Sequence, residues 1–317
     1  MSEALGQPTT DDDVFQELRP ELFGLAYRML AIAADAEDVV HEAYLRWRAQ
    51  PRDDVRSPRA FLVTVVTRLC LDTLGSARAR RETYMGPWLP EPLLVDELGP
   101  AGAAELSDSL SLAFLVVLEE LSALERAAFL LHDVFGYGYG ELSAALARDQ
   151  GACRQLVARA RKHVGARGRR FEADRARARE LTQRFLAACA GGDLAALLAV
   201  LADDVVVRTD GGGKAKAAPK PVTGAAKAAR FLIAIAQGTP VGTEVLEADL
   251  NGQPGLLAIY RSTAVSAVVL DIAEGRVNGV MVIANPDKLS AVNAALAERG
   301  GARTSIARQE GPNDKSG

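Results

Sequence analysis

The sequence predicts a multidomain fold in which two all-α domains precede an α+β domain. Three observations lead to this prediction. Apolar residues recur at helical spacing from Val14 to about Arg170. A segment rich in Pro and Gly interrupts this pattern at 84–107. Short β-branched runs replace it toward the C-terminus. The 317 residues suffice for two or three domains of ordinary size.

The first helical block contains three predicted helices. One carries an apolar face from Val14 to about Leu30, and the next begins near Asp35. The polar segment 48–56 is predicted to be a loop, after which a helix runs over 58–74. Serine caps a helix well and proline fits its first turn, so Ser57 and Pro58 mark this start. The residues of this helix expected to be exposed are Thr64, Thr67, Arg68 and Asp72.

The second helical block contains a helix-turn-helix pattern. Ser122 and Glu125 have the spacing of a capping box before an apolar run, and the glycines of 136–140 end that helix. Two helices follow near 140–147 and 150–167, joined by a tight connection. On the second of them, the outward face is predicted to comprise Gln150, Arg154, Gln155, Ala158, Arg159 and Lys162. These side-chain types bind bases and phosphates.

Charge is distributed unevenly along the chain, although the net charge is only −4. Nine carboxylates and no Lys or Arg lie in 82–125, whereas eight basic residues face one acid in 148–170. The basic block favours a surface that binds phosphate. The alternative is a pair of ordinary solvated helix faces.

The C-terminal part is predicted to be α+β, with helices first and antiparallel strands last. Helices are expected near 176–190, 193–201 and 224–236. Strands are expected at 204–209, 256–261, 265–272 and 277–283. Pro286 ends the last strand, and Asp287 is expected to cap a final helix that begins at Leu289.

Several classes of protein and site are not indicated by the sequence. The three cysteines are far apart within apolar stretches, and no cluster of Cys and His is present, so we expect neither a metal site nor a cofactor. No basic segment followed by an apolar run begins the chain, and no apolar run has the length of a membrane span. We therefore expect a cytoplasmic protein without a membrane partner.

Residues 14–171 resemble an extracytoplasmic-function sigma factor. The segments 26–30 and 35–43 are similar to sigma region 2, and 121–126 together with 152–156 looks like region 4. The remainder is similar to the subgroup with a fused SnoaL-like domain, an α+β cone. This second resemblance rests on three motifs: Trp88, Leu89, Pro90, Glu91 and Pro92 (WLPEP); Asp210, Gly211, Gly212, Gly213 and Lys214 (DGGGK); and Asn285, Pro286, Asp287, Lys288 and Leu289 (NPDKL).

The resemblance implies a domain order and a function. It divides the chain into sigma region 2 (14–83), a linker (84–107), sigma region 4 (108–171), a SnoaL-like regulatory domain (176–290) and a C-terminal tail (291–317). The expected function is to bind core RNA polymerase through the β′ clamp helices and the β subunit, and to initiate transcription at promoter DNA. The acidic stripe Asp35, Asp38 and Glu42 is expected to face the clamp helices.

Two groups of residues are expected to contact promoter DNA. Those expected to act in opening the minus-ten element are Arg48, Gln50, Arg52, Arg56, Thr64, Arg68 and Asp72. In the recognition helix, Arg154 and Gln155 are candidates for base edges of the minus-thirty-five element. Gln150 lies at the start of that helix, and Arg159, Lys162 and Arg167 are expected to hold phosphates.

The three motifs are expected to regulate activity, with WLPEP as the docking segment for the fused domain. The fold leaves room for a small-molecule ligand, which the sequence does not identify. The sequence also leaves two other functions open. The first is a ligand-sensing helix-turn-helix regulator that needs no polymerase. The second is a SnoaL-like isomerase or cyclase with a DNA-binding appendage, for which Asp210 and Asp271 are the acid–base candidates. With no nucleophile–base pair visible, we expect no catalysis.

Overall fold

The computed structural model describes residues 11–51, 55, 57–76, 84–94, 111–165 and 175–298, and the backbone of 77–82. The chain divides into two compact units. The helical unit comprises Met1–Tyr84 and Leu98–Phe171, and the sheet unit comprises Met85–Glu97 and Glu172–Gly317. Residues 85–97, which lie in the predicted linker, therefore group with the C-terminal part of the chain. Among the described residues, no helix is long and apolar enough to cross a membrane.

The first half of the helical unit is formed by α1 (Asp11–Leu30), α2 (Ala33–Ala49) and α3 (Pro58–Glu82). Ser57 caps α3 as predicted, because its hydroxyl accepts from the Ala60 N–H at 3.3 Å. One prediction for α3 is wrong: Thr67 is fully buried rather than exposed. Its hydroxyl donates to the Val63 carbonyl at 2.7 Å, so the helix backbone satisfies the buried polar group.

The second half of the helical unit contains the predicted helix-turn-helix. Its elements are α5 (Leu112–Glu119), α6 (Ala123–Phe129), a π-helical turn η4 (Leu130–Val134), α7 (Tyr139–Leu146) and α8 (Gln150–Gly165). Ser122 and Glu125 form the predicted reciprocal capping box. Ala147 takes a left-handed conformation between α7 and α8. Asp149 then caps α8 by accepting from the Ala152 N–H at 2.9 Å.

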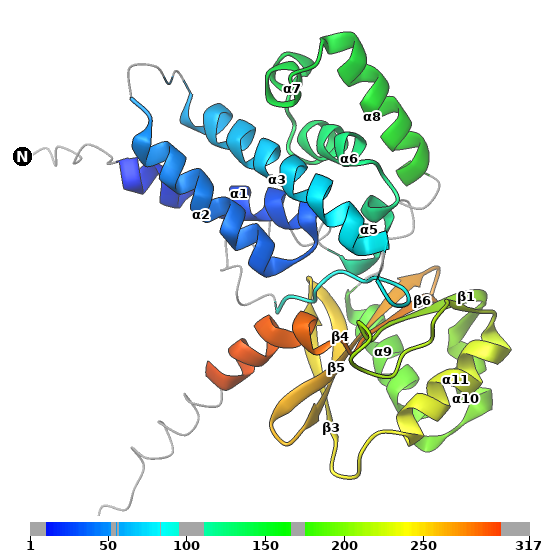
Figure 1. Ribbon diagram of the computed structural model, residues 1–317. Coiled ribbons are helices and arrows are strands. Elements are labelled where there is room, and N and C mark those ends of the chain that lie inside the picture. Colours follow the sequence, from blue (N-terminus) through cyan, green and yellow to red (C-terminus); the bar gives the residue numbers. More distant parts are fainter. Residues whose placement is uncertain are drawn as a thin grey trace, which may run out of the picture. The chain divides into compact units, whose positions relative to one another are not determined.

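The sheet unit packs three of its helices on one face of a mixed sheet (Figure 1). The helices are α9 (Arg175–Gly191), α10 (Leu194–Val200) and α11 (Ala225–Gln237). The strands are β1 (Leu201–Asp210), β2 (Val222–Thr223), β3 (Glu244–Leu250), β4 (Gln253–Tyr260), β5 (Thr263–Ala273) and β6 (Arg276–Ile283). Their order in the sheet is β2-β1-β6-β5-β4-β3. The β1–β6 pair is parallel and the other pairs are antiparallel. The core of this unit includes Phe185, Leu197, Val205 and Val280.

Three details of the sheet unit differ from the sequence prediction. The two-residue strand β2 was not predicted. Strand β3 was not predicted, because Glu and Asp, which are depleted in strands, make up three of its seven residues. The cap assigned to Asp287 is wrong: the Asn285 side chain accepts from the Asp287 N–H at 3.1 Å and caps a short 3₁₀ helix, η6 (Pro286–Leu289). A helix over 290–298 follows, and Asn293 joins it to Ala264 of β5 through two hydrogen bonds of 2.7 and 3.2 Å.

Candidate functional site

The acidic stripe lies on α2, beside the face formed by the buried residues of that helix. Asp38 is exposed, whereas Asp35 and Glu42 are half-buried. The neighbouring positions Val39 and Val40 are buried in the helical unit. Glu42 accepts from Arg46 at 2.8 Å, one turn further along. A basic partner that docks on this stripe therefore competes with only a half-exposed, weak ion pair.

The residues expected in the first DNA-binding loop lie partly on a helix. Arg48 belongs to the last turn of α2, not to a loop, and donates to the Tyr44 hydroxyl at 3.0 Å and to the Asp12 carboxylate at 3.4 Å. Gln50 ends α2 by donating its backbone N–H to the Trp47 carbonyl at 3.3 Å. Arg52 and Arg56 lie outside the described residues.

Helix α3 is joined to the helix-turn-helix through an arginine. Asp72 is exposed, and the half-buried Thr64 donates its hydroxyl to the Ala60 carbonyl at 2.8 Å. The Arg68 guanidinium donates to the carbonyl oxygens of Ala144 and Ala145, at 3.0 and 3.4 Å, near the C-terminal end of α7. A contact of the exposed Arg68 with DNA therefore shares its guanidinium with these two carbonyls or replaces them.

The recognition-helix candidate α8 has the two faces that the sequence predicts. Cys153, Leu156, Val157, Ala160 and Val164 are buried. The exposed residues are Gln150, Arg154, Gln155, Ala158, Arg159 and Lys162. Arg167 lies outside the described residues. The exposed face carries donors for base edges at its N-terminal half, where a recognition helix contacts bases.

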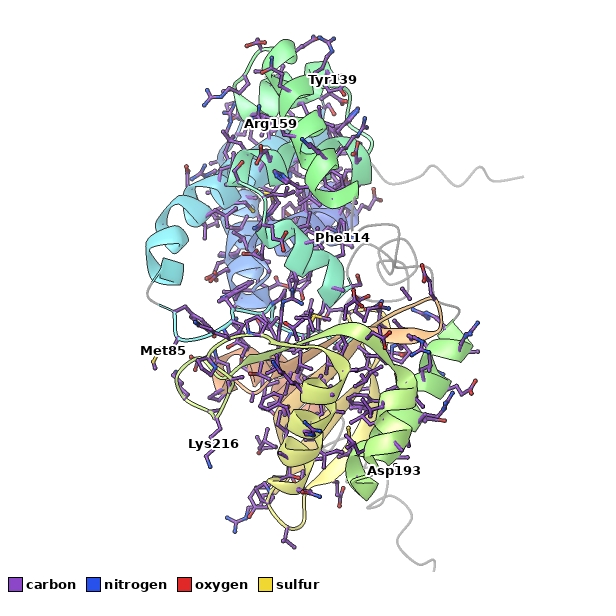
Figure 2. All side chains as sticks on the ribbon, turned by 90° about the vertical axis from the view of Figure 1, so that its right-hand side faces the viewer. Met85, Phe114, Tyr139, Arg159, Asp193 and Lys216 are labelled. Atoms are coloured by element: carbon purple, nitrogen blue, oxygen red, sulfur yellow. The ribbon has the colours of Figure 1, made fainter. Side chains whose placement is uncertain are left out.

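Two arginines of α8 are held by carboxylates of the preceding helical turns. Arg159 donates to Glu125 at 2.7 Å, and this hydrogen bond lowers the pKa of the Glu125 carboxyl below its ordinary value. Arg161 donates to both oxygens of Asp133, at 2.8 and 2.6 Å. Figure 2 shows Arg159 on the recognition helix and Tyr139 on α7. A phosphate that binds Arg159 therefore shares or competes for a guanidinium whose Nε–H already donates to Glu125.

In the sheet unit, a buried ion pair anchors the first part of a segment that we call the strap, residues 88–94. Asp210, at the end of β1, pairs with Lys288 of η6 at 2.7 Å. The same carboxylate accepts from the Leu89 N–H at 2.9 Å. The Lys288 ammonium donates to the Leu89 carbonyl and lies 3.9 Å from the centroid of the Trp88 ring. Residues of all three motifs therefore meet at Leu89.

The second part of the strap is held by the turn between β3 and β4. The Asn251 side chain accepts from the Leu93 N–H at 2.9 Å, and the Asn251 N–H donates to the Leu93 carbonyl at 2.8 Å. Leu94 then forms an antiparallel bridge with Leu250 of β3. Asn251 was missed in the sequence analysis. An Asn-Gly pair is a strong sequence signal for a hairpin turn, so Asn251–Gly252 could have been predicted to form this turn. Asn251 has the positive φ of 51° that such turns require.

The glycines of DGGGK bring the chain close to NPDKL. The Asp210 Oδ1 accepts from the Gly212 N–H at 3.0 Å. Gly212 has a φ of +58°, and a Cβ there would lie 2.3 Å from the Asn285 side-chain nitrogen, so a larger residue does not fit. Lys214 of DGGGK also forms an exposed ion pair with Asp287 of NPDKL, in which the lysine Nζ lies 2.6 Å from a carboxylate oxygen.

A tryptophan in the stiff proline frame of WLPEP is predicted to be exposed, and this prediction is wrong. Trp88 is half-buried against Lys288, and residues 89–92 are buried. The strap site is centred on the buried Asp210–Lys288 pair, whose side chains are 0% and 6% exposed. Removing one partner of a buried pair leaves a charge without compensation and typically costs about 3–5 kcal/mol.

The two carboxylates weighed as acid–base candidates lie on the sheet face away from the helices. Asp210 follows Val205 and Val207, and Asp271 lies between Leu270 and Ile272; these four apolar residues belong to the helix-covered core. Since side chains alternate along a strand, neither carboxylate points into that core. Among the described residues, no group of three or more His, Cys, Asp or Glu side chains is arranged to hold a metal ion.

Comparison with known families identifies both halves of the helical unit. The model of "Sigma-70 region 2" matches residues 14–80, and the model of "Sigma-70, region 4" matches residues 111–164. The second match includes α7 and α8.

Comparison with whole proteins extends the similarity across most of the chain. The ECF RNA polymerase sigma factor SigJ of Mycobacterium tuberculosis is 39% identical over 87% of this chain and 92% of its own length. The probable ECF RNA polymerase sigma factor SigI of the same species is 32% identical over 88% of this chain and 94% of its own. The crystal structure of SigJ matches with a TM-score of 0.72 at 36% identity, covering 88% of this chain and 98% of that one.

Proposed function

Because this chain belongs to the extracytoplasmic-function RNA polymerase sigma factors, we propose that it binds core RNA polymerase, recognises the minus-thirty-five and minus-ten promoter elements and initiates transcription. We further propose that the sheet unit regulates this activity through the strap. The single observation that supports regulation is the meeting of WLPEP, DGGGK and NPDKL at Leu89. Sigma activity places the protein in the cytoplasm, and we propose no catalytic role.

Polymerase binding is assigned to the acidic stripe of α2. Its carboxylates are available to a basic surface, since among the described residues only Glu42 of the three forms an ion pair, and that pair is half-exposed. Charge complementarity of this kind steers and orients docking more than it adds affinity. The β′ clamp helices are the proposed partner, with further contacts from the β subunit.

Promoter recognition is assigned to α3 and α8. The exposed N-terminal half of α8 presents Arg154 and Gln155, whose side chains can read guanine and adenine in the major groove. Lys162 lies further along the exposed face and is suited to a phosphate contact. Thr64, Arg68 and Asp72 of α3, with Arg48 and Gln50 before it, are proposed to contact the opened minus-ten element.

Regulation is assigned to the strap because it precedes region 4 in the chain and is fixed at both ends. The sheet unit binds main-chain groups of Leu89 and Leu93, so these contacts form only with the strap in one extended conformation. A sheet unit that holds or releases the strap changes the length of free chain between regions 2 and 4. We propose that this length limits how the two DNA-binding regions spread along a promoter. A small-molecule ligand of the sheet unit would shift the equilibrium between the held and the released strap.

Reconstituted transcription tests the proposed sigma activity. The purified full chain is added to core RNA polymerase and a library of genomic DNA fragments, and promoter-specific transcripts are sequenced. We expect transcripts that depend on the added protein, and we expect Asp38→Lys with Glu42→Lys to abolish both core binding and transcripts. Glu180→Lys, an exposed acid of the sheet unit, is the matched control. Specific DNA binding by the protein alone, without any transcripts, would instead support a ligand-sensing regulator.

A further inference from the structure

The side-chain contacts of Arg154 differ from those of Arg159 and Arg161 on the same helix. Arg159 and Arg161 each donate to a carboxylate, which neutralises much of their charge. The Arg154 guanidinium instead lies over the ring of Tyr139, 5.1 Å from the ring centroid. Among the described residues, its other contact is a long hydrogen bond of 3.4 Å to the Gln150 side chain. Arg154 therefore lies on an exposed helix face without a carboxylate partner among the described residues.

Tyr139 is itself fixed by a second ring. The centroid of the His132 ring lies 4.4 Å from that of Tyr139. His132 donates through Nδ1 to the Tyr137 carbonyl at 2.8 Å, which holds the imidazole against the loop before α7. His132 belongs to the π-helical turn η4, and such wide turns re-aim side chains, often at functional sites. His132 therefore contacts the same ring that the Arg154 guanidinium lies over.

We propose that Tyr139 is a positioning residue for promoter recognition, which presents the Arg154 guanidinium to a guanine of the minus-thirty-five element. This inference rests on the proposed function of α8. Stacking on a ring engages the face of a guanidinium and leaves the N–H groups at its edge available. A bidentate contact with O6 and N7 of guanine requires those N–H groups in a fixed plane. A side chain that is ordered before binding loses less entropy on docking.

The test measures base preference rather than overall affinity. Holoenzyme formed from core polymerase and the full chain is mixed with promoter fragments randomised over the minus-thirty-five element, and the bound pool is sequenced. Arg154→Ala should reduce the preference for guanine at one position by roughly 5- to 100-fold, the range expected for one bidentate pair. Tyr139→Ala should reduce the preference at that same position by roughly 2- to 5-fold, as expected for a lost cation–π contact.

Three variants control the experiment. Tyr139→Phe keeps the aromatic face and should retain the wild-type preference. Tyr139→Leu keeps an apolar contact without the ring, so it tests the stack if Tyr139→Ala fails to fold. Tyr260→Ala removes a ring that lies 5.1 Å from Arg261 in the sheet unit, the same geometry outside region 4, and should leave every position unchanged.

The outcomes separate this inference from the proposed function. If Arg154→Ala changes one position and Tyr139→Ala and Tyr139→Leu change none, the positioning role is wrong and the recognition role of α8 stands. If Tyr139→Ala reduces base preference to a similar extent at every position, Tyr139 has only a structural role, which also overturns the inference. If Arg154→Ala leaves every position unchanged, the proposed base contact itself is wrong.

Discussion

At the residue scale, one buried ion pair does most to explain why three distant motifs occur together. Asp210 and Lys288 each bind the other and also a main-chain group of Leu89, so three partners satisfy one another in a site closed to water. A buried pair is not by itself evidence of stability, because desolvation offsets much of its Coulombic gain. Because each charge depends on the other, Asp210 and Lys288 must both be present for the site around Leu89 to form.

We predict that Lys288→Met destabilises the sheet unit by about 3–5 kcal/mol, because it leaves Asp210 charged, buried and without its cation. The double variant Asp210→Asn with Lys288→Met should recover part of this loss, since no buried charge remains. Urea unfolding followed by Trp88 fluorescence, in a Trp47→Phe background that removes the second tryptophan, measures both. Equal stability of the Lys288→Met variant and its parent would contradict the role given to the pair.

The Glu125–Arg159 pair predicts a pH dependence. The pKa of Glu125 is lowered from its ordinary value of 4.5, chiefly by the hydrogen bond from Arg159. A carboxyl with a lowered folded-state pKa stabilises the fold above its unfolded-state pKa, and this stabilisation is lost as pH falls through the folded-state value. Glu125→Gln should therefore cost up to about 1 kcal/mol at neutral pH. Its difference from wild type in free energy of unfolding should shrink as pH falls below 4.5 and vanish below the folded-state pKa of Glu125, as measured by urea unfolding followed by circular dichroism. A constant difference across this range would contradict the assignment.

The same substitution should strengthen non-specific DNA binding. Freeing Arg159 from Glu125 makes one more cation available to phosphate, so the slope of log affinity against log salt should steepen by about one. Fluorescence anisotropy of a random duplex at several salt concentrations measures this slope. Glu120→Gln in the same unit is the control, and an unchanged slope in Glu125→Gln would show that Arg159 does not reach phosphate.

At the scale of elements, the helices were predicted more accurately than the strap site. Periodic apolar residues and caps such as Ser57 and Ser122 are local signals, and each of these two serines proved to be a cap in the structure. Strand β3 carries acids and lies at the edge of the sheet, so neither propensity nor alternation marks it. The contacts of Leu89 with Asp210 and Lys288 join residues more than a hundred positions apart, and no local pattern encodes such a pairing.

Gly212→Ala should loosen the turn that holds the strap. The added Cβ would clash with Asn285, and its φ of +58° is unfavourable for alanine. Hydrogen exchange of the Leu89 and Leu93 amides should become faster. Gly242→Ala provides a matched control, because Gly242 also has a positive φ but a Cβ there meets nothing within 4 Å. Equal exchange in the two variants would show that the close approach to Asn285 does not hold the strap.

The link between α3 and α7 is a second element-scale prediction. Arg68→Ala removes the donors to the Ala144 and Ala145 carbonyls, so amide exchange over 139–146 should increase. Asp72→Ala, an exposed position of the same helix, should leave this exchange unchanged. Exchange that stays at the wild-type rate in Arg68→Ala would show that other contacts hold the two helices together.

At the scale of the whole molecule, the chain carries its own regulatory candidate in the same polypeptide as its DNA-binding regions. The strap belongs structurally to the sheet unit, although it lies in sequence between regions 2 and 4. Truncations within 176–290 should therefore alter promoter output while polymerase binding remains, because the acidic stripe of α2 lies outside the removed part. A truncation that left output unaltered would remove the basis for a regulatory sheet unit.

The most direct test of strap regulation is reconstituted transcription with full-length Lys288→Met and core polymerase, compared with wild type and with Lys216→Met, an exposed lysine of the sheet unit. Hydrogen exchange at Leu89 first establishes that the strap is released in Lys288→Met alone. We predict that Lys288→Met binds core polymerase with wild-type affinity and changes promoter output. Lys216→Met should also bind with wild-type affinity but leave promoter output unchanged. Wild-type output from a protein whose strap is released would contradict the claim that the strap regulates transcription.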